Sequence, residues 1–492
     1  MTPNFAGLFH ALLPEAALVL GALVALAIDL AFGRGRTDAE RMQLSAVIGT
    51  FALFLAVYHT LAAGVSGPVF GGVLTIDPLA MATRLGVLVL AELTLVISSG
   101  SARPRNPAEY VAVLLFATTG FLVMAAAQQL LLAFLALELA SLSLYVLAGF
   151  DKTRPECAEA ALKYFLLGGM SAAFLLFGFS LLYGLTGSIE LPIIARQLSA
   201  QPLTPLLVVA LVMVMVAFGF KAAAAPFHLW APDVYQGAPP TSAALIASAS
   251  KLAGFTLFAR LLWSGFGAAA GSIAQSYVLP GWLPVVAAVS LASLLIGNFG
   301  ALAQTNVRRL LAYSAIAHAG AMLLGLMAAR RAGMGPLFYY AATYGLATVG
   351  AFGVIATVAQ TGPCERITDL AGLHRRSPLL ALCLFVFVLS LAGIPPLAGF
   401  FGKFNVFAAA LQINGLGGYI GWLTILAILL SAVGLYYYLI VLKQAIVAPP
   451  AKEAPPISVS PETAVALILT AALLIVLGLF PSVILRLFAV TP

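Results

Sequence analysis

Charged side chains are scarce in this chain. Only 8% of the 492 residues are Asp, Glu, Lys or Arg, whereas 62% are hydrophobic. Soluble domains carry roughly a quarter charged residues, so a water-soluble molecule of this composition would have too little polar surface to stay dissolved. The composition therefore predicts that lipid is the solvent for most of the chain.

Motifs for metals, dinucleotides and nucleic acids are also lacking. The three cysteines, Cys157, Cys364 and Cys383, are far apart and form no C-x-x-C pair, so no iron–sulfur or zinc site is expected. No G-x-G-x-x-G fingerprint follows a strand pattern. The net charge of +7 comes without a basic patch interleaved with aromatics. The sequence thus predicts no cofactor or metal in this chain and no nucleic-acid partner.

What the chain has in abundance is apolar runs. Fourteen of them are long enough, at about 20 residues, to span a bilayer as helices. They centre near residues 22, 53, 90, 118, 140, 171, 217, 252, 287, 317, 348, 391, 431 and 474. The N-terminus lacks the basic region of a cleavable signal peptide, so the first helix is expected to be retained. The predicted fold class is an all-α polytopic membrane protein of about fourteen transmembrane helices.

The basic residues of the loops predict an orientation. One set of alternate loops holds fourteen of them: Arg34, Arg36, Arg41, Arg103, Arg105, Lys152, Arg154, Arg308, Arg309, Arg366, Arg375, Arg376, Lys443 and Lys452. The opposite set holds Arg196, Arg330, Arg331 and Arg486. Because the loops richer in Lys and Arg stay in the cytoplasm, both termini are predicted to lie on the outer, periplasmic side.

Ionisable residues occur inside the apolar runs, where they are costly. Lys163, Lys221, Lys251, Lys403 and Glu138 are the clearest cases, and each central charge costs roughly 2.5–3.5 kcal/mol on the lenient insertion scale. One interpretation is that these charges only pair to fix helix packing. The other is a proton relay, because desolvation weakens the hold of a lysine on its proton while a nearby carboxylate strengthens it. We expect Lys221 and Glu138 to form such a switch.

Further ionisable residues are ambiguous in the sequence alone. Glu159 and Lys163 are four residues apart and can pair on one helix face. His228 and His318 suit either a proton shuttle or a packing role. A last group lies nearer helix ends or lacks an obvious partner, and packing is as good an explanation for it as function: Glu15, Asp29, Arg84 and Glu92.

Prolines predict two broken helices. Pro226 follows Lys221, and Pro395 and Pro396 precede Lys403; a proline cannot donate to the carbonyl four residues before it. Unwound backbone at membrane depth occurs only in a protein interior or a watered cavity, and paired interruptions point to a transport site. The two segments are five helices apart, which favours two inverted five-helix repeats. The predicted divisions are 1–108 for flanking helices, 109–270 and 271–445 for the repeats, and 446–492 for a loop and the last helix.

Three stretches resemble a known family. KAAAAPFHLWAPDVYQGAPPTSAALIASASKLAGF, LLAYSAIAHAG and LAGIPPLAGFFGKF are similar to signatures of the antiporter-like, proton-conducting membrane subunits of respiratory complex I. The opening LLPEAALVLGALVALAIDL, the end of the chain after the last predicted helix and a lysine at position 403 resemble the subunit N type of bacterial NADH-quinone oxidoreductase.

The resemblance implies roles for these residues. It makes Glu138 and Lys221 the ion pair, Lys251 the central relay and Lys403 the terminal group near the outward exit. It implies a bacterial inner-membrane complex whose other subunits hold NADH, FMN, iron–sulfur clusters and quinone. A second antiporter-like subunit and small helical subunits would be the membrane partners. Two alternatives stay open: a subunit of a related cation/proton antiporter or membrane-bound hydrogenase, and a non-pumping structural membrane subunit.

Overall fold

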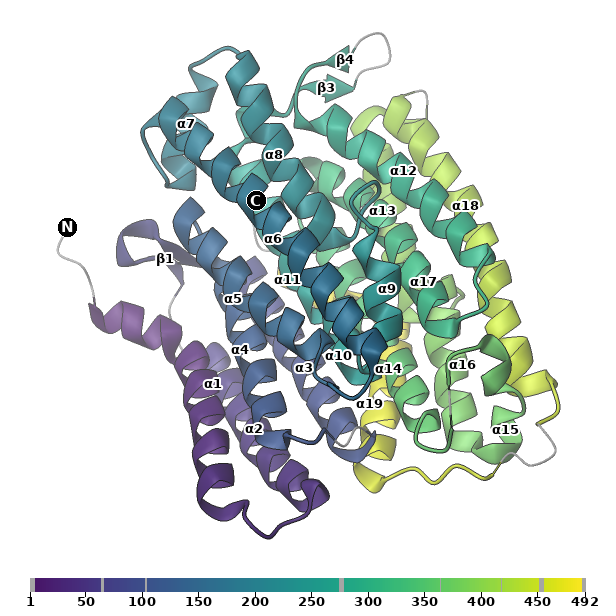
Figure 1. The fold of residues 1–492 in the computed structure, drawn as a ribbon. Helices are drawn as coiled ribbons and strands as arrows, with labels where there is room; N and C mark the ends of the chain where they lie inside the picture. The colour runs from purple at the N-terminus through teal and green to yellow at the C-terminus, as the bar shows by residue number, and fades with distance from the viewer. Residues whose placement is uncertain are drawn as a thin grey trace.

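A computed structural model describes residues 5–62, 66–101, 104–273, 278–362, 364–416, 418–450 and 455–488 of the chain (Figure 1). Arg103, Lys452 and part of the Pro-rich loop near residues 449–461 lie outside the described residues. In the described part, thirteen helices are long and apolar enough to cross a membrane. Two shorter apolar helices, Pro378–Ala392 and Ala398–Ile413, together form one more crossing. The total is then fourteen, and the predicted fold class is confirmed.

The crossings follow one another with short connections. Twelve are formed by α1 (Phe5–Phe32), α2 (Asp38–Ala62), α3 (Pro78–Ser101), α4 (Pro107–Ala126), α5 (Leu130–Ala148), α6 (Pro155–Thr186), α8 (Pro205–Ala222), α12 (Trp282–Leu302), α13 (Val307–Ala332), α14 (Gly335–Val358), α18 (Tyr419–Leu442) and α19 (Pro461–Leu479). The eighth crossing is α10 (Pro240–Ala247) with α11 (Ala249–Arg260), and the twelfth is α16 (Pro378–Ala392) with α17 (Ala398–Asn414). Short helices lie at α7 (Leu191–Ser199), α9 (Trp230–Gly237), α15 (Leu373–Arg376) and α20 (Ser482–Leu485).

Two small antiparallel hairpins were not predicted. One pairs β1 (Gly67–Val69) with β2 (Leu74–Ile76), and the other pairs β3 (Ser272–Ile273) with β4 (Val278–Leu279). Both lie at the same end of the bundle (Figure 1). They connect crossings, since β1 and β2 lie between α2 and α3 and β3 and β4 lie between the eighth crossing and α12.

Local sequence explains where the helices begin. Proline occupies the first turn of α4, α6, α8 and α10, where its missing N–H is no loss and its fixed φ suits a helix. Asn306 caps α13, its side chain accepting from the backbone N–H groups of Arg308 and Arg309 at 2.9 and 3.1 Å. Such caps satisfy donors that lipid could not.

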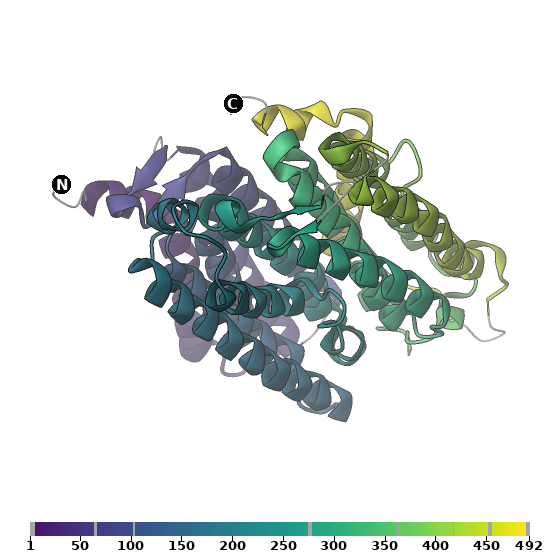
Figure 2. The same cartoon turned by 90° about the horizontal axis from the view of Figure 1, so that it is seen from above.

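The helices differ in how deeply they are buried. The most apolar windows of α14 and of the eighth crossing are fully buried, and that of α13 is 94% buried. The corresponding windows of α1, α2, α12 and α18 are only 39% buried. Seen from above, α1 and α2 form one edge of an elongated bundle and α18 lies toward the other (Figure 2). The centre is therefore built from the eighth crossing, α13 and α14.

The two ends of the described chain lie at the same end of the bundle. Ala11 near the start of α1 and Ala80 near the start of α3 share a small apolar cluster with β1 and β2. At the other end of the chain, the residues after α20 also contact α3, and Phe488 packs on Phe338 at 5.1 Å. An even number of crossings requires this arrangement.

Both predicted helix breaks are present. The seventh crossing stops after α8 at Ala222 and resumes as α9 at Trp230, and the twelfth stops after α16 at Ala392 and resumes as α17 at Ala398. A third break, at Ser248 between α10 and α11, was not predicted because no proline marks it. The division of the chain into repeats at the predicted boundaries stays a prediction.

Ion pairs hold the first three crossings to one another and to the rest of the bundle. Arg84 pairs with Glu15 at 2.5 Å and donates to the carbonyl of Ala11, and these two charged side chains are 3% and 7% exposed. Arg260 on α11 pairs with Asp77 at 2.5 Å just before α3. Glu15 and Arg84, which had no evident partner in the sequence, are thus partners of each other. Of the other two ambiguous acids, Asp29 pairs with Arg41 at 2.5 Å and Glu92 accepts from Thr50 at 2.9 Å.

We predict that Arg84→Met strongly destabilises the protein. Removing one partner of a buried ion pair leaves the other charge uncompensated, at about 3–5 kcal/mol. The matched control is Arg41→Met, whose ion pair with Asp29 is more exposed and is expected to contribute about 1 kcal/mol or less. Thermal aggregation of the detergent-purified protein measures both. Equal melting shifts for the two variants would contradict the prediction.

Candidate functional site

The candidate residues lie on helices that neighbour one another through the centre of the bundle. Glu138 is on α5, Lys221 is in the last turn of α8, and Lys251 is in the first turn of α11. His318 is on α13 and Lys403 is on α17. α11 contacts α5, α8 and α13, and α13 contacts α17. The fold thus brings five residues that span 266 positions of sequence into one succession of adjacent helices.

Glu138 and Lys221 face one small cavity without touching. Both line it together with Ser141 and Tyr145. Lys221 Nζ donates to Ser141 Oγ at 3.1 Å, and among the described residues no ion pair within 4.0 Å joins Lys221 to Glu138. The buried Oε1 of Glu138 has no hydrogen-bond partner in the protein. Glu138 and Lys221 therefore face the same cavity without an ion pair between them, and their action as a switch stays a prediction.

A narrow apolar space separates Lys221 from Lys251. Both lysines line it with Gly254, and the other walls include the phenyl rings of Phe218 and Phe258, which stack at 4.7 Å. A Cβ on Gly254 would come within 3.3 Å of Lys221 Cγ, so glycine at this position lets α8 approach α11 closely. The space between the two lysines is therefore lined mainly by apolar groups.

Lys251 points toward the second half of the chain. Its Nζ donates to the carbonyl of Ala315 on α13 at 2.5 Å and lies 5.4 Å from the centre of the Tyr344 ring. An ammonium ion is stabilised both by a carbonyl and by the face of an aromatic ring. The side chain is 2% exposed, so these groups take the place of water around it.

His318 is held by tyrosine hydroxyls. Its Nδ1 lies 2.6 Å from the hydroxyl of Tyr340, and its Nε2 lies 3.1 Å from that of Tyr438. Tyr438 also bonds Ser314. Neither tyrosine was predicted as part of the site. The spacing of four between Tyr340 and Tyr344 on an apolar helix could have indicated the first of them, whereas no local pattern indicates Tyr438. A hydrogen-bonded imidazole between two hydroxyls can pass a proton through either nitrogen.

Lys403 fills the second helix break. Its Nζ donates to the carbonyl of Ala392 at 2.9 Å, which is the carbonyl that Pro396 leaves without its helical partner. Gly393 adopts a φ of +84°, and a Cβ there would lie 2.9 Å from Lys403 Cδ. The break therefore provides both an acceptor for the ammonium group and the space for its side chain.

The other candidate residues lie away from this succession. His228 is buried in the break between α8 and α9, 6.5 Å from Tyr313 between ring centres, and its Nδ1 has no hydrogen-bond partner in the protein. Lys163 pairs with Glu159 at 2.6 Å, which confirms the expected i,i+4 contact. Lys163 also binds Asp233 on α9 at 2.7 Å. Asp233 was not among the predicted site residues, although it lies within a stretch that resembles the family.

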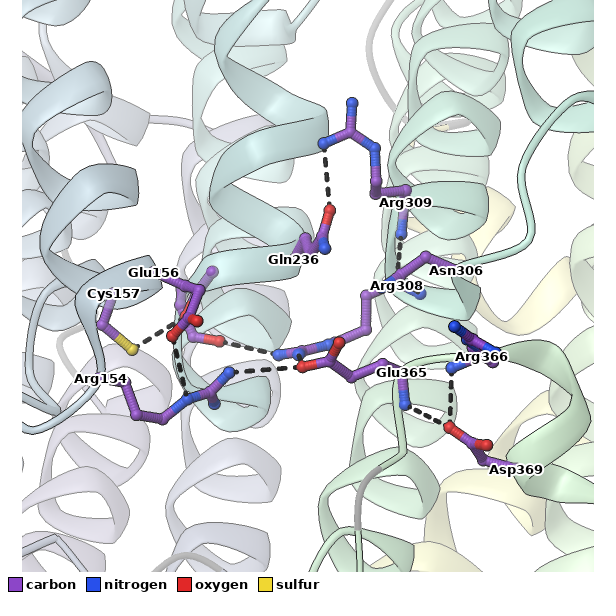
Figure 3. A network of polar contacts seen from close by, with 12 residues as sticks. Arg154, Glu156, Cys157, Gln236, Asn306, Arg308, Arg309, Glu365, Arg366 and Asp369 are labelled. Carbon is purple, nitrogen blue, oxygen red and sulfur yellow. Dashed lines mark hydrogen bonds and ion pairs between the residues drawn. The ribbon is translucent and has the colours of Figure 1, made fainter.

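A polar network lies close to this last pair. It joins the starts of α6 and α13, the end of α9 and the loop before α15 (Figure 3). Arg154 and Arg308 both reach Glu365, at 3.7 and 3.5 Å. Arg309 reaches Gln236 at 3.1 Å. Arg154, Arg308 and Arg309 are among the basic residues on the side predicted to be cytoplasmic.

Known proteins are similar to this chain in sequence and in fold. Residues 127–433 match the family described as NADH:quinone oxidoreductase/Mrp antiporter, TM. The chain belongs to that family. NADH-quinone oxidoreductase subunit N 2 of Acidobacterium capsulatum is 48% identical over 98% of this chain and 99% of that relative. The resemblance to the subunit N type is therefore confirmed.

Solved structures agree with this membership. A chain of respiratory complex I from Thermus thermophilus is 34% identical, with a TM-score of 0.79 over 97% of this chain and 99% of that chain. A chain of the Mrp complex from Dietzia sp. DQ12-45-1b has a TM-score of 0.78 at 20% identity, covering 99% of this chain and 96% of its own. At that identity the second match establishes a common fold only.

The cysteines of this NADH:quinone oxidoreductase/Mrp family member are isolated. Cys157, Cys364 and Cys383 are buried and unpaired, and no group of three or more His, Cys, Asp or Glu residues in the described ranges could hold a metal ion. Burial raises the pKa of the Cys364 thiol, which lies in a loop, to about 12. This thiol therefore stays protonated near neutral pH and is a poor metal ligand there.

Proposed function

We propose that the chain is a proton-translocating membrane subunit of NADH-quinone oxidoreductase. The main supporting observation is the succession of ionisable groups on adjacent helices through the centre of the bundle: Lys221, Lys251 and His318 are buried, and Glu138 and Lys403 are partly buried. Buried ionisable groups inside membrane proteins are expensive and mark ion pathways by default. The family membership supports the same assignment.

The first step is a switch at Glu138 and Lys221. When the pair closes, the carboxylate stabilises the ammonium form and Lys221 keeps its proton. When the pair opens, as in this structure, Lys221 keeps only the neutral Ser141 hydroxyl as a partner, and burial favours release of the proton. Electron transfer in other subunits would supply the free energy by biasing this equilibrium.

The later steps run through Lys251 and Lys403. Lys251 would receive the proton across the narrow space that it shares with Lys221. His318, between Tyr340 and Tyr438, would carry it toward Lys403. Lys403 is the terminal group near the outward exit. His228, Glu159 and Lys163 are not hydrogen-bonded to these residues, and we assign them no transfer step.

Other subunits provide the redox chemistry and the setting. NADH, FMN, iron–sulfur clusters and quinone would bind there, because this chain carries no motif for them. A second antiporter-like subunit and small helical subunits would adjoin the chain in a bacterial inner membrane. Both termini would be periplasmic, as the distribution of Arg and Lys predicts.

We expect Lys221→Ala and Lys403→Ala to abolish most coupled activity in the assembled complex. Each change removes a proton carrier, and loss of one step in a series should slow the whole by at least about tenfold. The measurements are NADH-driven quinone reduction and acidification of sealed vesicles, followed together. Lys443→Ala, which removes an exposed lysine at the end of α18, is the matched control.

Normal pumping per electron in the two assembled variants would refute the relay. Failure of both variants to assemble, with the control intact, would instead favour a structural role for the lysines. Copurification tests the antiporter and hydrogenase alternatives, because only a subunit of NADH-quinone oxidoreductase should bring down NADH-oxidising partners.

A glycine pair tests the geometry at the second break. Gly393→Ala places a methyl group against Lys403 at a positive φ. Gly187→Ala, at the end of α6, also has a positive φ, of +67°, but no atom lies within 4 Å of its added Cβ. Both variants carry the strain of the left-handed conformation, about 1 kcal/mol. Only the methyl group of Gly393→Ala contacts Lys403, so we expect this variant alone to lower acidification, by several-fold. Equal losses would show that Lys403 placement is not limiting.

Site-directed labelling tests the orientation. The three native cysteines are buried, so they give a low background for a membrane-impermeant maleimide. Lys152→Cys places an exposed thiol in the connection before α6, and Ser199→Cys places one at the end of α7, in the connection that follows α6. We expect Ser199→Cys to react in intact spheroplasts and Lys152→Cys to react only in inverted vesicles. The reverse pattern would place the termini in the cytoplasm.

A further inference from the structure

Asp233 stands where three helices meet. It lies on α9, the second half of the first broken helix. Its Oδ2 accepts from Lys163 Nζ of α6 at 2.7 Å, and its Oδ1 accepts from Arg309 Nη1 of α13 at 2.6 Å. One carboxylate therefore joins two cations that come from the first and second halves of the chain. Charge-assisted bonds of this kind are about twice as strong as neutral ones.

α9 depends on such contacts for its position. It has only eight residues, no side-chain hydrogen bond caps its start, and the break after Ala222 separates it from α8. A short helix without continuity to its neighbour takes its place from tertiary contacts. The end of α9 is held from the same two sides: Cys157 of α6 donates to Gly237 O at 2.9 Å, and Arg308 of α13 donates to Ala238 O at 3.2 Å.

The helix on the other side of Asp233 carries proposed relay groups. α13 provides the carbonyl of Ala315, which accepts from Lys251, and the imidazole of His318. Arg309 precedes Ala315 by six residues, about 9 Å along a helix axis. A shift of α9 against α13 would therefore change the placement of the acceptor for Lys251 relative to the break beside Lys221.

We propose that Asp233 is a positioning residue for proton translocation, which fixes α9 between α6 and α13 and thereby sets the geometry between the first helix break and Lys251. This inference rests on the proposed function. The charges around Asp233 are Lys163, Arg309 and Glu159, so the group is balanced with two cations and two carboxylates. If Asp233 is neutralised, Glu159 is the carboxylate of the group that still pairs with Lys163. Arg309 then keeps its hydrogen bond to the neutral side chain of Gln236.

The test compares Asp233→Asn with Asp233→Glu and with Glu365→Gln in the assembled complex. Glu365→Gln removes a carboxylate from the adjoining network (Figure 3), where Glu365 binds Arg154 and Arg308, and leaves the bonds of Asp233 in place. We expect Asp233→Asn to lower NADH-driven acidification about fivefold or more, Asp233→Glu to recover at least about half of it, and Glu365→Gln to stay near the parent value.

A double variant separates positioning from general stability. If Asp233 acts through Lys163, then Asp233→Asn combined with Lys163→Gln should lose little more acidification than Asp233→Asn alone. Unchanged acidification in Asp233→Asn, additive losses in the double variant, or failure of Asp233→Asn to assemble when Glu365→Gln assembles would each overturn the proposal. Lys221→Ala in parallel distinguishes the two proposals, because its normal activity would refute the relay itself.

Discussion

The structure depends on one constraint: polar groups placed in lipid must find their partners inside the protein. Backbone N–H and C=O groups satisfy this constraint by bonding to one another within helices. The long segments in the described part of the chain are therefore helical. The same constraint explains the breaks. Where Pro396 leaves the carbonyl of Ala392 without its helical partner, the ammonium group of Lys403 donates a hydrogen bond to that carbonyl. At this break the freed carbonyl and the ammonium group thus satisfy each other.

Partner exchange within this constraint gives the site its chemistry. Lys221 binds the neutral Ser141 while Glu138 keeps an unpartnered oxygen in the same cavity. Lys251 and Lys403 each bind a backbone carbonyl, which cannot take a proton. Glu138 faces Lys221 across the cavity and can gain or lose a full charge, as can His318 farther along the succession. A change of charge at Glu138 therefore acts directly on the first lysine.

Anchoring and transfer are divided between different regions. Strong ion pairs lie at both ends of the bundle, with Arg84–Glu15 and Arg260–Asp77 at one end and Asp233 with its two cations at the other. The centre contains weaker, neutral contacts around Lys221, His318 and the tyrosines. A rigid frame with a loosely bonded centre suits proton transfer, because the frame holds distances while the central groups change partners.

The membrane class, the number of crossings, the two breaks marked by proline and the lysines inside apolar runs could all be predicted from the sequence. They follow from composition, helix length and local backbone chemistry, which are properties of single segments. The partners of these residues emerge only in the folded protein: Ser141 for Lys221, Ala315 for Lys251, and Asp233 for Lys163. The tertiary structure alone revealed the break at Ser248 and the tyrosines around His318. Partners far apart in sequence are chosen by helix packing, and apolar helices of similar composition leave that choice open until they fold.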